Sequence, residues 1–363
     1  MALLVPLHFA SAKFWGFVVI KVLIVDDSAV VRKILSTELG KYSDIQIVGA
    51  APNPFIARDM IVELKPDVLT LDIEMPKMDG LTFLSKLMKH YPMPVIIVSS
   101  LTRTSMDMTI KALEVGAVDV VSKPGSSFSV GELIKTLVEK IRLASRAKIK
   151  NTSENVKITP VSQKIMIDTT SKIVAIGAST GGTEAIREVL EALPQNFPGI
   201  VIAQHMPAGF TTSFAERLND LCKIEVKEAE DGEQIVMGRA LLAPGNYHLT
   251  VKRIGAKYFV EVKTGPQVHY QRPSVDVLFD SVAKEVGKNA IGVILTGMGA
   301  DGAAGIKKMK ESGSYTIGQD EKSCVVYGMP RAAFEMGGIV QEMPLQKISA
   351  RLVELLNKQE YTF

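Results

Sequence analysis

A serine lies at a glycine-rich turn in the segment KIVAIGASTGGTEAI, residues 172–186. The apolar run before the turn is typical of a buried strand, and the stretch after it is typical of a helix. Residues 177–181 fit the pattern G-x-S-x-G, in which a sharp strand-to-helix turn exposes a serine hydroxyl at the edge of a sheet. Ser179 is therefore a candidate nucleophile for acyl transfer.

Other interpretations of this turn assign it to phosphate binding or to packing alone. A Walker loop requires a lysine before its serine or threonine, but Gly182 precedes Thr183 here. The dinucleotide fingerprint G-x-G-x-x-G requires a glycine where Ser179 stands. Both phosphate-binding patterns lack a required residue. Small residues that only let a helix pack closely on a strand remain an alternative to the nucleophile.

A nucleophilic serine needs a base, and the chain contains five histidines. His205 ends the apolar run GIVIAQHMP, so in a parallel sheet it would emerge at the same edge as Ser179. Asp301 follows the run VILTGMGA at a helix start, whereas Asp276 and Asp280 are spaced along a helical stretch. Asp301 is thus the better candidate for the orienting acid. A strand-end histidine and a helix-capping aspartate are the structural alternatives.

These residues predict a Ser-His-Asp triad, in a chain order that differs from the orders of the familiar serine hydrolase folds. His205 would take the proton of Ser179 and return it to the leaving group, while Asp301 would fix the imidazole tautomer. Backbone N–H groups in the glycine-rich turns near Thr180 and Met298 would stabilise the tetrahedral oxyanion.

Acidic side chains also follow the strand runs of the N-terminal half. Asp26 and Asp27 come after VLIV, Asp72 after VLTL, Ser99 after VIIV, and Lys123 after DVVS. Strand ends of a parallel sheet share one edge, so these groups are expected in one crevice. Crowded carboxylates repel one another, and oxygen ligands at this density suit Mg²⁺. The alternative is that each aspartate only caps a helix or a turn.

This ordered set, with MPKMDG after the central aspartate, resembles the receiver domain of two-component response regulators over most of residues 18–140. The resemblance implies that Asp72 is the phosphoryl acceptor. It also implies that Asp27 and Asp72 ligate Mg²⁺ with the backbone carbonyl of Glu74, and that Asp26 acts through water.

The resemblance implies two switch residues as well. Lys123 would pair with the acyl phosphate, and Ser99 would move to bond it. Phosphorylation replaces a carboxylate with a group of greater charge and three acceptor oxygens, enough to bias a two-state loop.

Strand runs that alternate with amphipathic helices predict an α/β protein with two doubly wound domains. Residues 18–142 would form the receiver, with a flavodoxin-like parallel sheet, after an N-terminal extension at 1–17. The polar, basic stretch 143–170 would be a linker. Residues 171–363 would form a Rossmann-like, mostly parallel sheet. Hairpin-like turns in RALLAPGNYHLTVKRIGAKYFVEVK predict a β-hairpin, which would make the second sheet mixed.

Composition excludes several classes of protein. The net charge of +3, from 42 Lys+Arg and 39 Asp+Glu, is too even to indicate nucleic acid or an anionic membrane as the main partner. Cys222 and Cys324 form neither a metal-binding spacing nor a disulfide framework, so a cytoplasmic protein is expected. The apolar first twenty residues lack a basic start and are interrupted by Lys13, which favours an extension over a signal peptide or an inserted anchor.

Further motifs in the C-terminal half are GASTGG, AQHMPAGFTTSFAERL, APGNYHL, RPSVDVLF and LTGMGADG. Together they resemble the catalytic domain of the chemotaxis protein-glutamate methylesterases, which follows a receiver domain and a linker. The resemblance extends from about Val18 to the C-terminus and implies Ser179, His205 and Asp301 as the triad.

The resemblance further implies a phosphorylation-activated esterase that demethylates glutamate γ-methyl esters on cytoplasmic helices of chemoreceptors, releases methanol and deamidates particular glutamines. A chemotaxis histidine kinase would be the phosphodonor, and the esterase chemistry itself would need no cofactor. A DNA-binding response regulator is the alternative in another class, but it predicts a basic helix-turn-helix that the sequence lacks. A catalytically inactive scaffold would not need all three triad residues.

Overall fold

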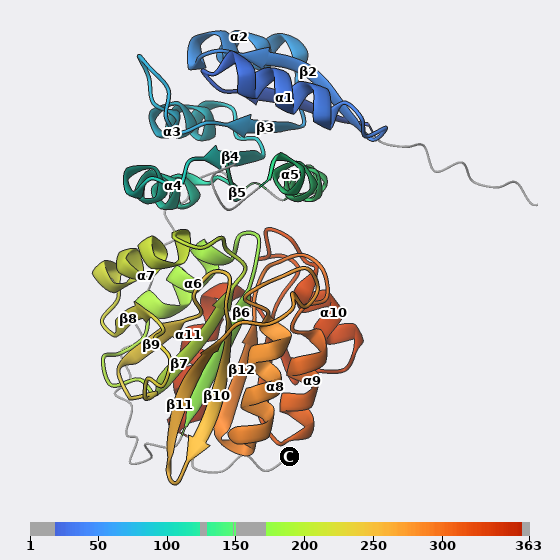
Figure 1. Cartoon of the computed structure of the whole chain (residues 1–363). Coiled ribbons are helices and arrows are strands. Elements are labelled where there is room, and N and C mark those ends of the chain that lie inside the picture. Colours follow the sequence, from blue (N-terminus) through green and yellow to red (C-terminus); the bar gives the residue numbers. More distant parts are fainter. Residues whose placement is uncertain (1–18, 124–128, 148, 150–171, 358–363) are drawn as a thin grey trace, which may run out of the picture.

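The computed structural model describes residues 19–123, 129–147, 149 and 172–357. The N-terminal extension expected at 1–17 lies outside these residues, as does most of the expected linker at 143–170. Two layered α/β units lie one above the other in Figure 1, and each contains a central sheet between helices.

The N-terminal sheet has the order β2-β1-β3-β4-β5, and every pairing in it is parallel. Its strands are β1 (Ile20–Val25), β2 (Ile45–Ala51), β3 (Val68–Leu71), β4 (Val95–Ser99) and β5 (Asp119–Ser122). Its helices are α1 (Ala29–Leu39), α2 (Pro54–Leu64), α3 (Gly80–His90), α4 (Arg103–Val115) and α5 (Val130–Ala144). Apolar residues of α1 and α5 pack on one face, and those of α2, α3 and α4 pack on the other.

The C-terminal sheet has the order β14-β13-β12-β6-β7-β9-β8. Its strands are β6 (Ile173–Ala178), β7 (Gly199–Gln204), β8 (Glu225–Glu228), β9 (Arg239–Leu242), β12 (Ala290–Ile294), β13 (Tyr315–Gln319) and β14 (Gln341–Met343). Its helices are α6 (Gly182–Glu191), α7 (Phe210–Leu221), α8 (Val275–Glu285), α9 (Ala303–Glu311), α10 (Met329–Glu335) and α11 (Leu345–Asn357), with a 3-10 turn at Gly287–Asn289.

The expectation of a mixed second sheet is wrong, because every pairing in the seven-stranded sheet is parallel. The predicted hairpin exists as β10 (His248–Ile254) and β11 (Lys257–Lys263), which pair antiparallel in a sheet of their own. Its apolar face packs against α8, and the backbone N–H of Val251 donates to Ser281 Oγ at 2.9 Å. The hairpin buries its apolar side on a helix and needs no pairing with the main sheet.

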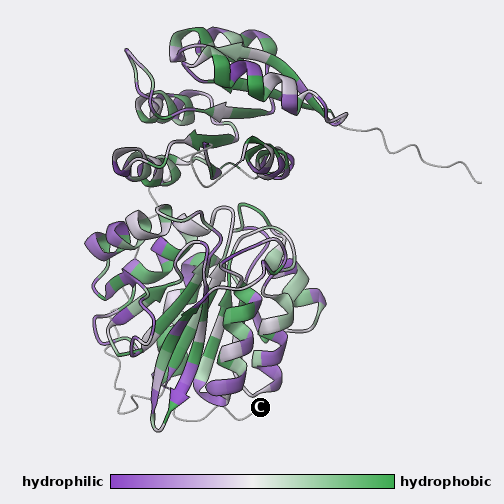
Figure 2. Ribbon diagram, in the orientation of Figure 1, coloured by the Kyte–Doolittle hydropathy of each residue, from purple (hydrophilic) through white to green (hydrophobic). Residues whose placement is uncertain are grey.

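Hydropathy explains why both sheets are central. The strands are the most hydrophobic segments in Figure 2, whereas the outer helix surfaces carry the hydrophilic residues. All residues of β6 and β7 are buried, as expected for parallel strands covered on both faces. Helices α6, α7 and α11 cover one face of the C-terminal sheet, and α8, α9, α10 and the hairpin cover the other.

The predicted α/β architecture is thus present in both halves. Helix α5 ends at Ala144, two residues beyond the receiver boundary expected at residue 142. Its start is fixed by a capping box, in which Ser129 and Glu132 each satisfy a backbone N–H of the other.

Candidate active site and phosphorylation site

The glycine-rich turn after β6 lies where the order of the strands reverses in the C-terminal sheet. Strand β6 is flanked by β7 on one side and by β12 on the other, the arrangement that opens a crevice at the carboxyl ends of parallel strands. Gly181 adopts φ 75° in this turn, and a Cβ there would lie 2.7 Å from Val325. A side chain is therefore excluded both by the backbone conformation and by the space available.

Ser179 and His205 are held beside one another by continuation of the strand ladders. The backbone N–H of Ser179 donates to the carbonyl of Thr296 beyond β12 at 3.0 Å. The backbone N–H of His205 donates to the carbonyl of Ala178 at 3.1 Å. Residues from the ends of β6, β7 and β12 therefore meet at one edge, as the sequence predicted from parallel topology.

His205 and Asp301 make a short, nearly buried contact, with 2.7 Å between Nε2 and Oδ2. Three further donors reach the same carboxylate from the start of α8: Ser274 Oγ at 2.7 Å, Val275 N at 2.7 Å and Asp276 N at 3.0 Å. Burial alone would raise the pKa of Asp301, but the bond and charge of His205 and these donors hold it below the ordinary value. Asp301 is therefore ionised at neutral pH.

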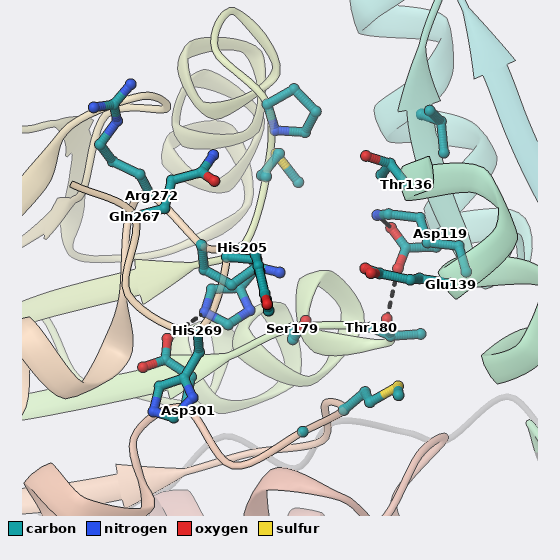
Figure 3. Close-up of a pocket in the computed structure, with 18 of the residues that line it drawn as sticks. Asp119, Thr136, Glu139, Ser179, Thr180, His205, Gln267, His269, Arg272 and Asp301 are labelled. Carbon is teal, nitrogen blue, oxygen red and sulfur yellow. Dashed lines mark hydrogen bonds and ion pairs between the residues drawn. The ribbon is translucent and has the colours of Figure 1, made fainter. Parts of the chain in front are cut away.

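This contact determines which imidazole nitrogen is basic. An ionised carboxylate only accepts hydrogen bonds, so Nε2 of His205 carries a proton. In the neutral imidazole Nδ1 is then the free base, the reverse of the orientation in the chymotrypsin-type triad. Ser179 is half-buried and lines the same cavity as His205 and Asp301 (Figure 3). Within the described residues, the Ser179 hydroxyl makes no hydrogen bond to His205. In catalytic pairs this hydrogen bond is commonly long without substrate and shortens when substrate binds.

The backbone N–H groups of Thr180 and Met298 make no hydrogen bond within the described part of the chain. Both residues line the cavity with Ser179. The backbone at Gly297 lies so close to Ser179 that a Cβ on Gly297 would be 2.6 Å from the Ser179 Cβ. The two turns therefore bring N–H donors to the neighbourhood in which an oxyanion would form.

The cavity, of about 730 Å³, is closed on one side by the N-terminal unit. From β5 and α5 the lining residues include Asp119, Glu132, Lys135, Thr136, Glu139 and Lys140. Thr180 Oγ1 donates to Asp119 Oδ2 at 2.5 Å, one residue from the candidate nucleophile (Figure 3). Lys135 Nζ lies 4.8 Å from the centre of the Tyr270 ring. Sequence reasoning missed Asp119 because nothing in a single sequence indicates which surfaces of two domains meet.

A second contact between the two units joins α4 of the N-terminal unit to α7 of the C-terminal unit. Arg217 binds Glu114 with two hydrogen bonds, of 2.7 and 3.1 Å. Arg103 and Glu216 form a longer pair of 3.5 Å between side chains that are 79% and 55% exposed. The bidentate pair fixes the register of the two helices, whereas the exposed pair contributes little.

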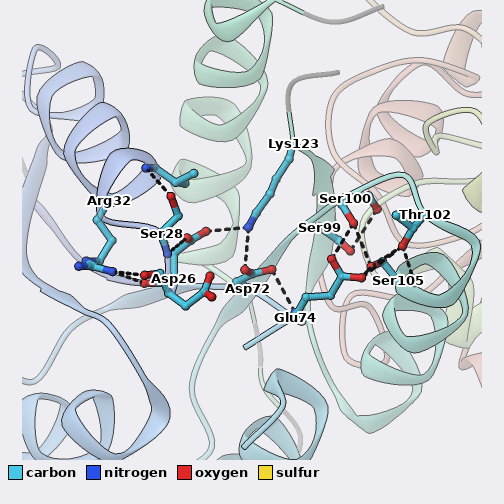
Figure 4. A network of polar contacts seen from close by, with 12 residues as sticks. Asp26, Ser28, Arg32, Asp72, Glu74, Ser99, Ser100, Thr102, Ser105 and Lys123 are labelled. Atoms are coloured by element: carbon cyan, nitrogen blue, oxygen red, sulfur yellow. Dashed lines mark hydrogen bonds and ion pairs between the residues drawn. The ribbon is translucent and has the colours of Figure 1, made fainter. Parts of the chain in front are cut away.

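The acidic residues of the N-terminal unit meet at the carboxyl edge of its sheet, as predicted. Lys123 Nζ lies 2.7 Å from Asp72 Oδ2 and 2.9 Å from Asp26 Oδ2 (Figure 4). One oxygen each from Asp26, Asp27 and Asp72 lies within 4.8 Å of the others. Burial raises the pKa of Asp72 above its ordinary value, although Lys123 opposes this shift. The pKa of Lys123 is raised, because bonds to Asp72 and Asp26 outweigh its burial.

The two remaining receiver candidates lie beside this cluster. Ser99 is fully buried, and its hydroxyl donates to the Ser100 carbonyl at 3.4 Å, away from Asp72. The Glu74 N–H donates to Asp72 Oδ1 at 3.2 Å. The Glu74 carboxylate accepts from Ser105 Oγ and also from Ser100 and Thr102, at 3.0 and 3.2 Å.

Sequence reasoning assigned only the Glu74 backbone and missed its side chain. The hydroxyl-rich stretch SSLTRTS at the start of α4 was the available signal. The Ser105 bond is the largest influence on Glu74, whose pKa is held below the ordinary value. Glu74 therefore connects the Asp72 loop to α4, the helix that packs against α7.

The sequence interpretation set Asp276 aside, but it lies at the same site. Its side chain is buried at the start of α8 and lies 3.1 Å from His269 Nε2.

Among the described residues, no helix has the length and apolarity needed to cross a membrane.

The folds and their polar edges define a class of protein: a response regulator receiver whose output unit is an α/β enzyme domain. Two family models match the chain, "Response regulator receiver domain" over residues 22–137 and "CheB methylesterase" over residues 174–352.

Named relatives agree over nearly the whole chain. "Protein-glutamate methylesterase/protein-glutamine glutaminase 2" of Syntrophus aciditrophicus is 58% identical over 340 residues, which cover 93% of this chain and 99% of the relative. The corresponding Salmonella typhimurium protein is 52% identical over 336 residues, covering 92% and 96% of the two chains. The crystal structure of the Thermotoga maritima CheB methylesterase catalytic domain is 42% identical, with a TM-score of 0.50, and covers 52% of this chain and 100% of that one.

The chain belongs to the protein-glutamate methylesterase family of chemotaxis response regulators. The predicted family, fold class and enzyme class are thereby confirmed.

Proposed function

We propose that this chain hydrolyses glutamate γ-methyl esters on chemoreceptors and releases methanol, with Ser179 as nucleophile, His205 as base and Asp301 as orienting acid. The observation that carries the proposal is the 2.7 Å contact between His205 Nε2 and the ionised Asp301, in the cavity that Ser179 also lines. The names of the relatives, which are methylesterases and glutaminases, support the substrate class.

The acylation step uses Nδ1 of His205. This nitrogen accepts the proton of Ser179 Oγ as the oxygen attacks the ester carbonyl, and the free N–H groups of Thr180 and Met298 stabilise the oxyanion. The imidazolium then donates its proton to the departing methoxy oxygen, so that methanol leaves and a glutamyl ester of Ser179 remains. Asp301 stabilises the imidazolium because its carboxylate is held ionised by its own donors.

Deacylation repeats these steps with water as the nucleophile. His205 removes a proton from the water as it attacks the acyl carbonyl, and then returns that proton to Ser179 Oγ as the product carboxylate leaves. A glutamine side chain presents the same carbonyl, and ammonia can leave with a proton from His205. The same site would therefore also deamidate receptor glutamines, in keeping with the glutaminase names of the relatives.

The receiver would accept a phosphoryl group on Asp72 from a chemotaxis histidine kinase. Asp26, Asp27 and Asp72 fit a hard cation, because their oxygens converge within 4.8 Å at an edge that Asp27 leaves open to solvent. Asp27, Asp72 and the Glu74 backbone carbonyl would hold Mg²⁺, with Asp26 acting through water. When bound, the ion would neutralise phosphate oxygens during the transfer. Lys123 would pair with the acyl phosphate, and Ser99 would turn from the Ser100 carbonyl to bond it.

In the unphosphorylated protein the receiver would cover the catalytic edge. Support comes from the cavity wall formed by α5 and from the bond between Thr180 and Asp119. Phosphorylation would alter the contacts of Glu74 with the start of α4 and so loosen the packing of α4 against α7.

Methanol release from methyl-labelled receptor membranes tests this proposal. Ser179→Ala should lose at least about 10³-fold in rate, whereas Ser312→Ala, at an exposed helix end, should match the unaltered protein. A small-molecule phosphodonor with Mg²⁺ should raise the rate, and deletion of residues 1–145 should do the same without it. Equal release by the Ser179 variant would refute the nucleophile, and a deletion without gain would refute the cover.

A further inference from the structure

A second histidine–aspartate pair lies behind the orienting acid. His269 Nε2 lies 3.1 Å from Asp276 Oδ2, and the Asp276 N–H donates to Asp301 Oδ1 at 3.0 Å. One side-chain atom each from His269, Asp276 and Asp301 lies within 4.8 Å of the others. A continuous series of contacts thus runs from His269 through the two aspartates to His205.

The pair is built into the fold. Asp276 is buried in the first turn of α8, and its Oδ1 accepts the Gly305 N–H at 2.6 Å. His269 lines the cavity with its side chain 49% exposed. His269 and Tyr270 both have left-handed backbones, with φ of 51° and 60°. Residues other than glycine adopt this conformation at a cost, and such residues cluster at functional sites.

Two carboxylates in one buried site repel each other. Asp301 is compensated by His205 and by three donors at the start of α8, whereas Asp276 has the Gly305 N–H and the His269 imidazole. Burial and the Asp301 charge raise the pKa of Asp276, whereas the Gly305 N–H and His269 oppose this shift. His269 is therefore positioned to favour the ionised form of Asp276 beside Asp301.

We propose that His269 and Asp276 form a charge pair that sets the basicity of His205 through Asp301. This inference rests on the proposed esterase mechanism, because His205 must become an imidazolium in each acyl-transfer step. The Asp276 charge favours the imidazolium, and the opposite charge of protonated His269 limits that effect. Both are positioning residues, since neither is placed at the reacting carbonyl.

Other charged groups surround this pair and are common to all variants compared. They come from the cavity rim, from α5 across the cavity, and from α8 and α9 behind the site: Arg272, Glu132, Lys135, Glu139, Lys140, Asp280 and Lys308.

Opposite substitutions in the pair predict opposite shifts. Asp276→Asn keeps an acceptor for Gly305 but removes a negative charge, so the imidazolium of His205 becomes less stable and its titration midpoint falls by about half a pH unit or more. His269→Asn keeps a donor but removes the positive charge, so the midpoint rises, by less because His269 is half exposed. The double variant should return toward the unaltered protein.

Histidine NMR titration of the full chain measures the midpoint directly, with His205→Asn to assign the signal. His90→Asn, an exposed histidine on α3, is the matched control and should leave the midpoint unchanged. The acid limb of methanol release against pH should move with the NMR midpoint, whereas a purely structural role would lower the rate at every pH. Since NMR requires no turnover, it separates failure of this inference from failure of the esterase mechanism.

Shifts of opposite sign would establish the charge pair. An unchanged midpoint in either single variant, or shifts of the same sign, would overturn it. Should Asp276→Asn fail to fold in a melting experiment, His269→Asn alone decides, since an unmoved or lowered midpoint there contradicts the proposal.

Discussion

Asp301 and Asp72 occupy equivalent positions in the two halves of the molecule, each near the carboxyl edge of a parallel sheet beside its switch point. Both are almost fully buried, at 2% exposure. Their pKa values nevertheless move in opposite directions, downward for Asp301 and upward for Asp72. Burial near the end of a parallel strand therefore does not by itself determine the charge of an aspartate.

The difference lies in the donors that each carboxylate receives. Asp301 accepts hydrogen bonds from His205 and from three donors at the start of α8, and these donors stabilise its negative charge. Asp72 accepts from Lys123 and from one backbone N–H, with the Asp26 charge nearby. One site stabilises a permanent charge, while the other leaves capacity for an added cation and phosphoryl group.

Of the substitutions at these two aspartates, Asp301→Asn should lower the rate of catalysis most. An amide does not stabilise the imidazolium and does not fix the tautomer with Nδ1 free, so the rate of methanol release should fall about 10⁴-fold. Asp280→Asn, at a partly exposed ion pair with Lys308, should change the rate less than about twofold. A comparable loss in both variants would argue against a specific role for Asp301.

The opposite pKa shifts predict opposite effects on stability. The low folded pKa of Asp301 stabilises the fold above the ordinary aspartate pKa, and this contribution is lost as pH falls toward the folded value. The raised pKa of Asp72 favours its neutral form, so its contribution is fully present at acid pH and is lost as pH rises through the folded value.

Melting experiments on the two asparagine variants test these signs. At pH 7, Asp301→Asn should destabilise its domain by about 2 kcal/mol, whereas Asp72→Asn should stabilise the receiver by about 1 kcal/mol. As the pH is lowered, the Asp72 difference should shrink first, because its folded pKa lies above the ordinary aspartate value. The Asp301 difference should shrink only below the ordinary aspartate pKa, as the pH approaches the lower folded value. Shifts of the same sign at pH 7 would contradict the contrast between the two sites.

The sequence predicted residues at strand ends well, because parallel topology alone brings the ends of β6, β7 and β12 together. It did not predict the imidazole orientation, which depends on the start of α8 reaching Asp301 from a distant segment. Asp276 was set aside on helical spacing, but the helix containing it begins at the catalytic edge. Asp119 escaped notice because its role comes from the docking of two domains, which no local pattern encodes.

Asp119→Ala tests whether the two edges are coupled. The substitution removes the acceptor of Thr180 Oγ1 and the ion pair with Lys140, so the cover over Ser179 should weaken by about 1 kcal/mol. Methanol release without a phosphodonor should then rise about fivefold, with a smaller additional gain on phosphorylation. Arg103→Ala removes the exposed 3.5 Å pair with Glu216 and should leave unstimulated release within twofold. An unchanged or lower rate for Asp119→Ala, in a variant that melts normally, would mean that the receiver wall of the cavity does not restrain the esterase.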